Sequence, residues 1–315
     1  MNTHIILTCS GLLVRCRLSA AFLSVVCFLM VTGCQRAEEL GPVAEPASVA
    51  EIRQAFSSGA DALASDGAAI ATGTGWATLR GQFVYDGTPP QMKPYDVRGE
   101  DRAKCSRAGK APLQETLLVD PETMGIANVV IFIRDAARVH ESAQPNDESI
   151  VFDQKECVFL THVAAMTVGQ TLEIKNSDPM GHNTKIEGRK NVFNQSVPAN
   201  ETLVFSPQKE EPVPVSVACS IHPWMAAYFL PRANGYHAVT GADGSFEIAN
   251  VPAGEVLEFQ VWHESVGARD GGPLVLETPE AKSLKWSRKG RFKIRLEENE
   301  EKVLNLTVPA SALGG

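Results

Sequence analysis

Apolar and polar residues alternate along most of the chain from residue 76 onward. Phe292, Ile294 and Leu296 alternate with charged residues, and the stretch 304–308 repeats this pattern. A period of two places successive side chains on opposite faces of a strand, so these segments predict strands with one buried face. Glycine, proline and Asn-Asp turn signals separate the segments, and no long helical period occurs. The pattern predicts an all-β protein built from sandwiches.

The predicted strands divide into two units, and one unit is formed by two separate segments of the sequence. These segments, residues 76–144 and 233–311, resemble the start and end of the carboxypeptidase regulatory-like (transthyretin-like) sandwich, which ends in T-x-x-D-G-x-F and P-x-G motifs. Asp243-Gly244 suits a tight hairpin, and Gly254 permits a positive-φ turn. We expect residues 145–232 to form a second sandwich inserted into, or adjacent to, the first. Two domains in tandem are the alternative.

The N-terminus carries a targeting signal. Two arginines precede an apolar stretch over 18–31, which is shorter than the roughly 20 residues that a transmembrane helix needs. Residues 1–33 therefore predict a secretory signal peptide. The following Cys34 resembles the lipidated cysteine of a bacterial lipobox, although Val31 stands where leucine is usual. This resemblance implies a lipid anchor in a membrane, at the periplasmic face of the outer membrane or elsewhere in the cell envelope. An ordinary cleaved signal or an uncleaved anchor remains open.

Composition and charge narrow the class of partner. Residues 34–75 are rich in Ala, Ser, Gly and Glu and predict a flexible linker. The net charge is −8, and removal of 1–33, with its two arginines and no acids, makes it −10. An acidic chain lacks the cationic surface that nucleic acid requires, so we expect no nucleic-acid partner.

The cysteines pose a question of pairing. The chain has seven, of which three lie within 1–33 and Cys34 is the candidate for lipidation. Cys105, Cys157 and Cys219 remain, and an odd number in an oxidising compartment leaves one unpaired. We expect Cys105 and Cys157 to form a disulfide that joins the two sandwiches and stabilises the fold by about 2–4 kcal/mol. Sequence alone does not give their distance, so an unbridged pair stays open.

The unpaired cysteine lies close to other metal-binding residues. Period-two alternation places Cys219 on the same face as the two valines before it, and a short loop then carries His222 and Met225. Upstream, a predicted strand over 171–176 is followed by a loop that delivers His182. Two imidazoles, a thiolate and a thioether are the ligands of a trigonal His₂Cys copper site with a weak axial methionine. The predicted cofactor is copper.

The spacing of these residues resembles the cupredoxin family of blue copper proteins. The Cys-x-x-His-x-x-Met loop is similar in length to that of the amicyanins, and the upstream Asn-x-Asp…His-Asn pattern also matches. The resemblance implies a Greek-key sandwich over 145–232 with copper held by His182, Cys219, His222 and Met225. It also implies that Asn183 tethers the two ligand loops through Ser220.

The match to the cupredoxins has one departure, and a wider resemblance covers more of the chain. The glycine that cupredoxins place near the axial methionine is absent after Met225, which removes no ligand. Residues 79–264 as a whole resemble a group of bacterial proteins described as methylamine-utilisation-like, and this description gives no substrate.

The predicted function is one-electron transfer without substrate turnover, and the chain is not expected to be an enzyme. Its partner would be a redox protein, namely a dehydrogenase, a cytochrome or an oxidase. Met180, Pro223 and Trp224 border the ligands and are expected to form an apolar docking patch beside His222, unless Trp224 packs inward.

Other functions remain open. An envelope interaction or scaffold protein could carry a structural or lost copper site, and a storage or delivery protein would bind copper without cycling it. At the site itself, the alternatives are a thiol nucleophile with a histidine base, a structural zinc ion, or no metal.

Overall fold

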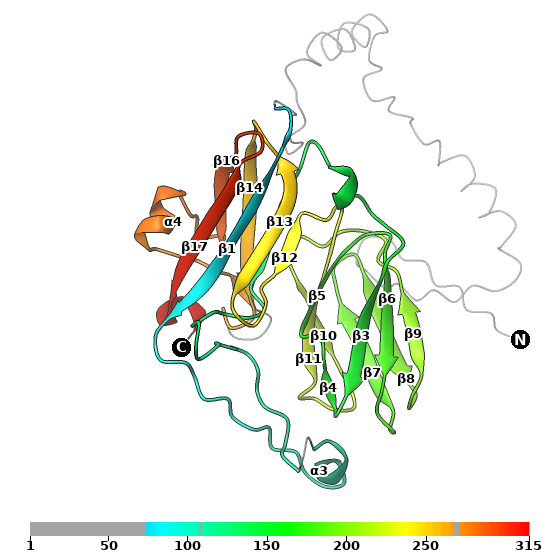
Figure 1. Ribbon diagram of the computed structural model, residues 1–315. Coiled ribbons are helices and arrows are strands. Elements are labelled where there is room, and N and C mark those ends of the chain that lie inside the picture. The colour runs from blue at the N-terminus through cyan, green and yellow to red at the C-terminus, as the bar shows by residue number, and fades with distance from the viewer. Residues whose placement is uncertain (1–72, 107–108, 268–270, 315) are drawn as a thin grey trace, which may run out of the picture. The chain divides into compact units, whose positions relative to one another are not determined.

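The computed structural model describes residues 73–106, 109–267 and 271–314 (Figure 1). Strands are the main regular elements of this part of the chain. It also contains two short helices, α3 (Asp101–Lys104) and α4 (Pro279–Ser283), and 3-10 turns at Glu141–Ala143 and Ala310–Leu313. The predicted all-β class is confirmed. The predicted signal peptide, Cys34 and nearly all of the predicted linker lie outside the described residues. Within those residues, no helix has the length and apolarity needed to cross a membrane.

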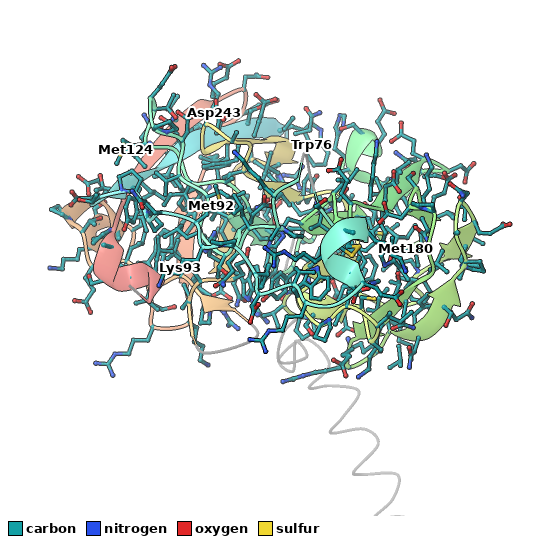
Figure 2. All side chains as sticks on the ribbon, turned by 90° about the horizontal axis from the view of Figure 1, so that it is seen from below. Trp76, Met92, Lys93, Met124, Met180 and Asp243 are labelled. Carbon is teal, nitrogen blue, oxygen red and sulfur yellow. A yellow bond between two sulfur atoms is a disulfide. The ribbon has the colours of Figure 1, made fainter. Side chains whose placement is uncertain are left out.

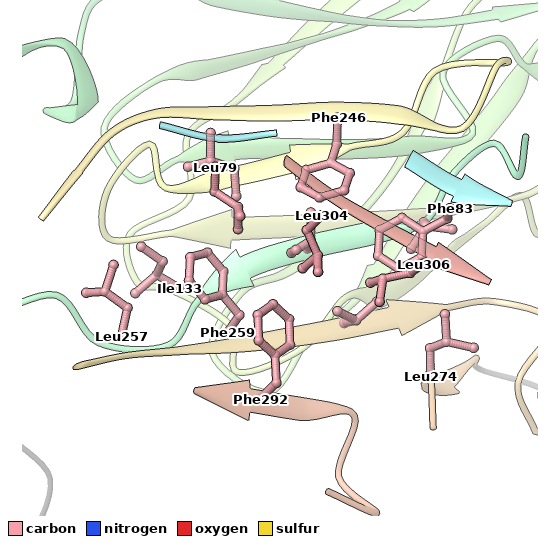
Figure 3. Close-up of a cluster of buried hydrophobic side chains, with 14 of the residues drawn as sticks. Leu79, Phe83, Ile133, Phe246, Leu257, Phe259, Leu274, Phe292, Leu304 and Leu306 are labelled. Carbon is pink, nitrogen blue, oxygen red and sulfur yellow. The ribbon is translucent and has the colours of Figure 1, made fainter. Parts of the chain in front are cut away.

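The first sandwich is made of two sheets. In one sheet β1 is central, antiparallel to β13 and parallel to β17. In the other, β2 lies between β12 and β14, and β14 also pairs with β15 and β16. The strands are β1 (Trp76–Asp86), β2 (Val130–Ile133), β12 (His237–Val239), β13 (Ser245–Pro252), β14 (Val256–His263), β15 (Gly272–Pro273), β16 (Arg291–Arg295) and β17 (Glu301–Pro309). Alternating residues such as Leu79, Phe292 and Leu304 fill the core between the sheets (Figure 3).

The second sandwich carries the residues of the candidate site. One sheet has the order β4-β3-β6-β9, and the other has the order β5-β11-β10-β7-β8. The strands are β3 (Ser149–Lys155), β4 (Val158–Phe159), β5 (Val163–Thr167), β6 (Thr171–Asn176), β7 (His182–Glu187), β8 (Val192–Val197), β9 (Thr202–Phe205), β10 (Val215–Ala218) and β11 (Ala226–Arg232). Their inward side chains form a separate core that includes Cys219 and Met225. Two of the four candidate ligands are therefore part of the hydrophobic interior of this sandwich.

The chain leaves the first sandwich after β2 and returns to it at β12, so strands on both sides of 145–232 share sheets. A third cluster, which includes Phe132 of β2 and Leu230 of β11, joins the two sandwiches. Arg232 strengthens this junction because its guanidinium donates to the carbonyl oxygens of Ile133 and Arg134.

The Asp243-Gly244 turn differs from the expected hairpin. Gly244 has φ +77° and supplies the positive-φ turn. However, the turn joins β12 to β13, which lie in different sheets. The residues fix the local bend of the backbone, but they do not decide which strands pair.

Residues 87–106 and 109–118, here called the strap, lie between β1 and β2 of the first sandwich but pack on the second. Tyr95 donates its N–H to the carbonyl of Pro112, which closes the strap on itself. Val97 and Cys105 are buried in the core of the second sandwich, although the strap follows a strand of the first. Seen from below, the short helix α3 of the strap lies beside Met180 (Figure 2). The strap therefore covers the end of the second sandwich that holds the candidate site.

Candidate metal centre

Strand pairing brings the two ligand segments together. β7 and β10 are antiparallel neighbours, with Lys185 opposite Ala218. The start of one antiparallel strand lies near the end of its partner. His182, which begins β7, and Cys219, which follows β10, therefore lie at the same end of these two strands.

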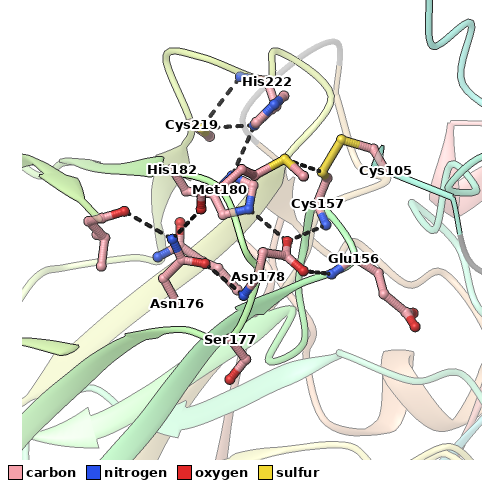
Figure 4. Close-up of polar contacts among 12 residues, drawn as sticks. Cys105, Glu156, Cys157, Asn176, Ser177, Asp178, Met180, His182, Cys219 and His222 are labelled. Atoms are coloured by element: carbon pink, nitrogen blue, oxygen red, sulfur yellow. Dashed lines mark hydrogen bonds and ion pairs between the residues drawn. A yellow bond between two sulfur atoms is a disulfide. The ribbon is translucent and has the colours of Figure 1, made fainter. Parts of the chain in front are cut away.

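The loop after β10 then folds back on itself. Cys219 donates its N–H to the carbonyl of Met225 at 3.2 Å, and Met225 donates to the carbonyl of His222 at 2.9 Å. These bonds bring His222 to the same point as the other two residues. The ligand atoms of His182, Cys219 and His222 all lie within 4.8 Å of one another, and all three residues are buried (Figure 4). Met225 is also buried, in the same core as Cys219.

The two imidazole rings face each other through equivalent atoms. His182 Nδ1 lies 2.9 Å from His222 Nδ1, and Cys219 Sγ lies 3.9 Å from His222 Nδ1. On the other side of its ring, His182 Nε2 donates to Asp178 Oδ2 at 2.7 Å. The Asp178 carboxylate also accepts the backbone N–H groups of Glu156 and Cys157. This carboxylate thus fixes the orientation of the His182 ring.

The environment favours the forms of these groups that bind metals. Burial raises the pKa of the Cys219 thiol. Hydrogen bonds from His182 and from the N–H groups of His222 and Asn183 lower this pKa by a larger amount, so the net shift is downward. The pKa of His222 is lowered, first by burial and then by the positive charge of His182. Both shifts favour the metal-binding forms, which are the thiolate of Cys219 and the neutral imidazole of His222.

The pKa of His182 shifts in the opposite direction. Burial lowers its pKa, but the hydrogen bonds to Asp178 and Cys219 outweigh burial and raise the pKa to about 9. The pKa of Asp178 is lowered despite burial, because His182 and two backbone N–H groups donate to it.

This arrangement fits a metal ion. Two Nδ1 atoms 2.9 Å apart need either a hydrogen or a metal ion between their lone pairs. Since His182 Nε2 donates to Asp178, its Nδ1 faces His222 and is the atom that would bind a metal ion in place of this hydrogen bond. Two imidazoles and a thiol, with Met225 buried in the same core, suit copper, whereas structural zinc sites use further Cys or His in place of Met.

Asn183 and Ser220 lie in contact, as the family resemblance implies. Asn183 Oδ1 accepts hydrogen bonds from the Ser220 N–H at 3.2 Å and from its hydroxyl at 2.9 Å. The Asn183 amide also donates to the carbonyl of Gln195 on β8. These hydrogen bonds connect the residue that follows His182 to the residue that follows Cys219.

The Cys105 and Cys157 side chains form a disulfide next to the site. Cys157 Sγ lies 3.8 Å from the sulfur of Met180, and the indole N–H of Trp224 donates to the carbonyl of Cys157 at 3.1 Å. The disulfide therefore attaches the strap to the turn between β3 and β4, and this turn contacts one residue of each ligand loop.

The expected docking patch is partly covered. Pro223 is exposed, whereas Met180 and Trp224 are half-buried against the core. The His222 side chain is only 3% exposed, and its Nε2 lies 3.9 Å from Asp101 Oδ1 of α3. The strap thus covers the ring edge that the patch was expected to border.

Two residues that contact the candidate histidine ligands, Asp178 and Asp101, were not predicted from the sequence. Asp178 belongs to the Asn-x-Asp pattern that was recognised, but its position four residues before His182 was the only signal of a role. Asp101 gave no signal, because its contact with His222 depends on how the strap packs.

Comparison with known proteins gives a limited result. No protein-family model and no curated protein matches the sequence. A reduced Cu(I) amicyanin mutant is similar at 18% identity over 28% of this chain and 86% of its own, with a TM-score of 0.25. Amicyanin from Paracoccus versutus is similar at 17% identity over 32% of this chain and 97% of its own, with a TM-score of 0.24. A copper-containing nitrite reductase from Thermus scotoductus is similar at 19% identity over 28% of this chain and 23% of its own, with a TM-score of 0.25.

Proposed function

We propose that this protein binds one copper ion through His182, Cys219, His222 and Met225 and uses it to carry single electrons. The observation that carries this proposal is the convergence of one sulfur and two nitrogen donors within 4.8 Å at a buried point. When bound, copper supplies one-electron chemistry by alternating between Cu(I) and Cu(II).

The side chains would hold the ion in one geometry for both oxidation states. Cys219 supplies a soft thiolate that two backbone N–H groups already stabilise. His182 is oriented by Asp178, and Asn183 fixes the spacing of the two ligand loops. Because the ligands follow strands of a packed sheet, they need little rearrangement when the charge on the metal changes. Their burial excludes water from the site.

The chain as a whole would act as a carrier and not as an enzyme. Its partner would be a redox protein, a dehydrogenase, cytochrome or oxidase, that exchanges one electron at a time. Lipidation of Cys34 would hold it at the cell envelope. A transient redox partner needs only a small interface, below about 1,200 Å².

The test is the colour of the copper-loaded protein. Addition of one equivalent of Cu(II) should give an intense blue colour that ascorbate bleaches and that Cys219→Ser abolishes. His140→Gln is the matched control, because His140 lies in the first sandwich and should leave the colour unchanged. A protein that stays colourless after copper loading is not this kind of carrier. Tight Cu(I) binding without a blue form would instead indicate storage or delivery, and no copper binding would indicate a scaffold.

A further inference from the structure

A second group of metal-binding atoms lies on the other side of His222. The sulfurs of Cys105 and Cys157 and a ring nitrogen of His222 lie within 4.8 Å of one another, and all three residues are buried. His222 Nδ1 faces His182 and Cys219, while its Nε2 faces the strap. His222 therefore lies between two clusters of candidate ligands and belongs to both.

This second group is rich in sulfur. The thioether of Met180 lies 3.8 Å from Cys157 Sγ, which places three sulfur atoms together beside one imidazole (Figure 4). As a disulfide, the two cysteines cannot bind a metal as thiolates. As thiols, they would offer two soft ligands with a thioether next to them, and such ligands select Cu(I).

Contacts other than the disulfide hold the two cysteines in place. Cys157 donates its N–H to Asp178 and accepts a hydrogen bond from the Trp224 indole. Cys105 donates its N–H to the carbonyl of Asp101, and Val97 anchors the strap in the core. The Cα atoms are 5.1 Å apart, so reduction leaves two neighbouring thiols without separating the segments that carry them.

We propose that Cys105 and Cys157, when reduced, form a second copper site that binds one Cu(I) ion with Met180 beside it. Reduction requires a thiol reductant: two thiols give two electrons and two protons to the disulfide and become a disulfide themselves. Binding of Cu(I) by both sulfurs then releases the two cysteine protons. The oxidation state of this cysteine pair decides whether the chain holds one copper ion or two.

The experiment is an anaerobic titration of Cu(I) against a chromophoric Cu(I) chelator. The full chain is compared before and after reduction, with the reductant removed by gel filtration and the thiols counted. The oxidised protein should bind one equivalent and the reduced protein two. The Cys105→Ser/Cys157→Ser variant should bind one equivalent with or without the reduction step. Equal stoichiometry of reduced wild type and this variant would overturn the proposal.

A separate variant distinguishes this proposal from the proposed function. Cys219→Ser removes the thiolate of the first site only, so it should lose one equivalent of copper in both states and still gain one on reduction. If the oxidised protein binds no copper while reduction adds one equivalent, the proposed function fails and the second site stands. Circular dichroism of the reduced protein is the remaining check. Loss of its β signal would show that the cysteines cannot be held as a site, which overturns the proposal.

Discussion

Removal of the Cys105–Cys157 disulfide should measurably destabilise the fold. The bridge joins residues 52 positions apart. For a closed loop of this length, the chain-entropy model gives about 4 kcal/mol of stabilisation at 25 °C, because the cross-link restricts the unfolded chain. In a domain of 150–250 residues, 1 kcal/mol corresponds to about 2–4 °C, so the melting temperature should fall by about 8–16 °C. Typical stabilities of about 5–15 kcal/mol mean that the protein should still fold.

The assay is thermal unfolding of the metal-free protein, followed by circular dichroism. Cys105→Ser/Cys157→Ser should melt at the same temperature as the reduced wild type, and a reductant should not lower the melting temperature of the variant further. A decrease of less than about 2 °C would refute the reasoning, since other contacts of the strap would then already restrict the unfolded chain as much as the bridge does.

Two further perturbations test the burial of charge-bearing groups. His263 is fully buried, and burial lowers its pKa from 6.5 to about 4. Since the unfolded chain binds this proton more tightly, its contribution to stability is constant above about pH 6.5 and falls by roughly 1.4 kcal/mol per pH unit between about pH 6.5 and 4. Urea unfolding of wild type and His263→Gln across this range should show a shallower decrease in the variant, and parallel curves would contradict the assignment. Arg232→Met removes a buried guanidinium that donates to three carbonyl oxygens at the junction of the sandwiches, and it should cost about 3 kcal/mol or more in urea unfolding. The exposed pair Arg80–Glu301 supplies the control, because Arg80→Met should cost less than about 1 kcal/mol, and equal losses would rule out a structural role for Arg232.

The ligand loop can be predicted from the sequence because three of the four candidate ligands lie close together along the chain. Cys219, His222 and Met225 lie within seven consecutive residues, and alternation before Cys219 indicates which face the thiol takes. His182 is distant in sequence, but it also follows a strand signal, and sandwiches bring such loops to one end. Residue type, spacing and period therefore suffice to predict that His182, Cys219 and His222 converge.

The strap could not be predicted in the same way. Val97 and Ala111 pack on the core of the second sandwich, although nothing in the local pattern distinguishes them from residues of an ordinary loop. The contact between Asp101 and His222 joins residues far apart in sequence and depends on how the strap packs on the second sandwich. The sequence indicated that Cys105 needs a partner. It did not indicate that the segment around Cys105 would cover a ligand.

The turn between β3 and β4 has a backbone conformation that its own residues disfavour and that a tertiary contact stabilises. Glu156 and Cys157 both have φ +56°, the left-handed conformation of a two-residue hairpin turn that usually selects Asn and Gly. For other residues this conformation costs roughly 1–2 kcal/mol each, so the sequence gives no reason to expect it. Both N–H groups, however, donate to the carboxylate of Asp178, and that carboxylate also accepts from His182. Charge-assisted hydrogen bonds are worth about 1.5–3 kcal/mol each, enough to offset the backbone cost. The conformation that presents Cys157 to the strap is thus stabilised by the same side chain that orients a candidate copper ligand.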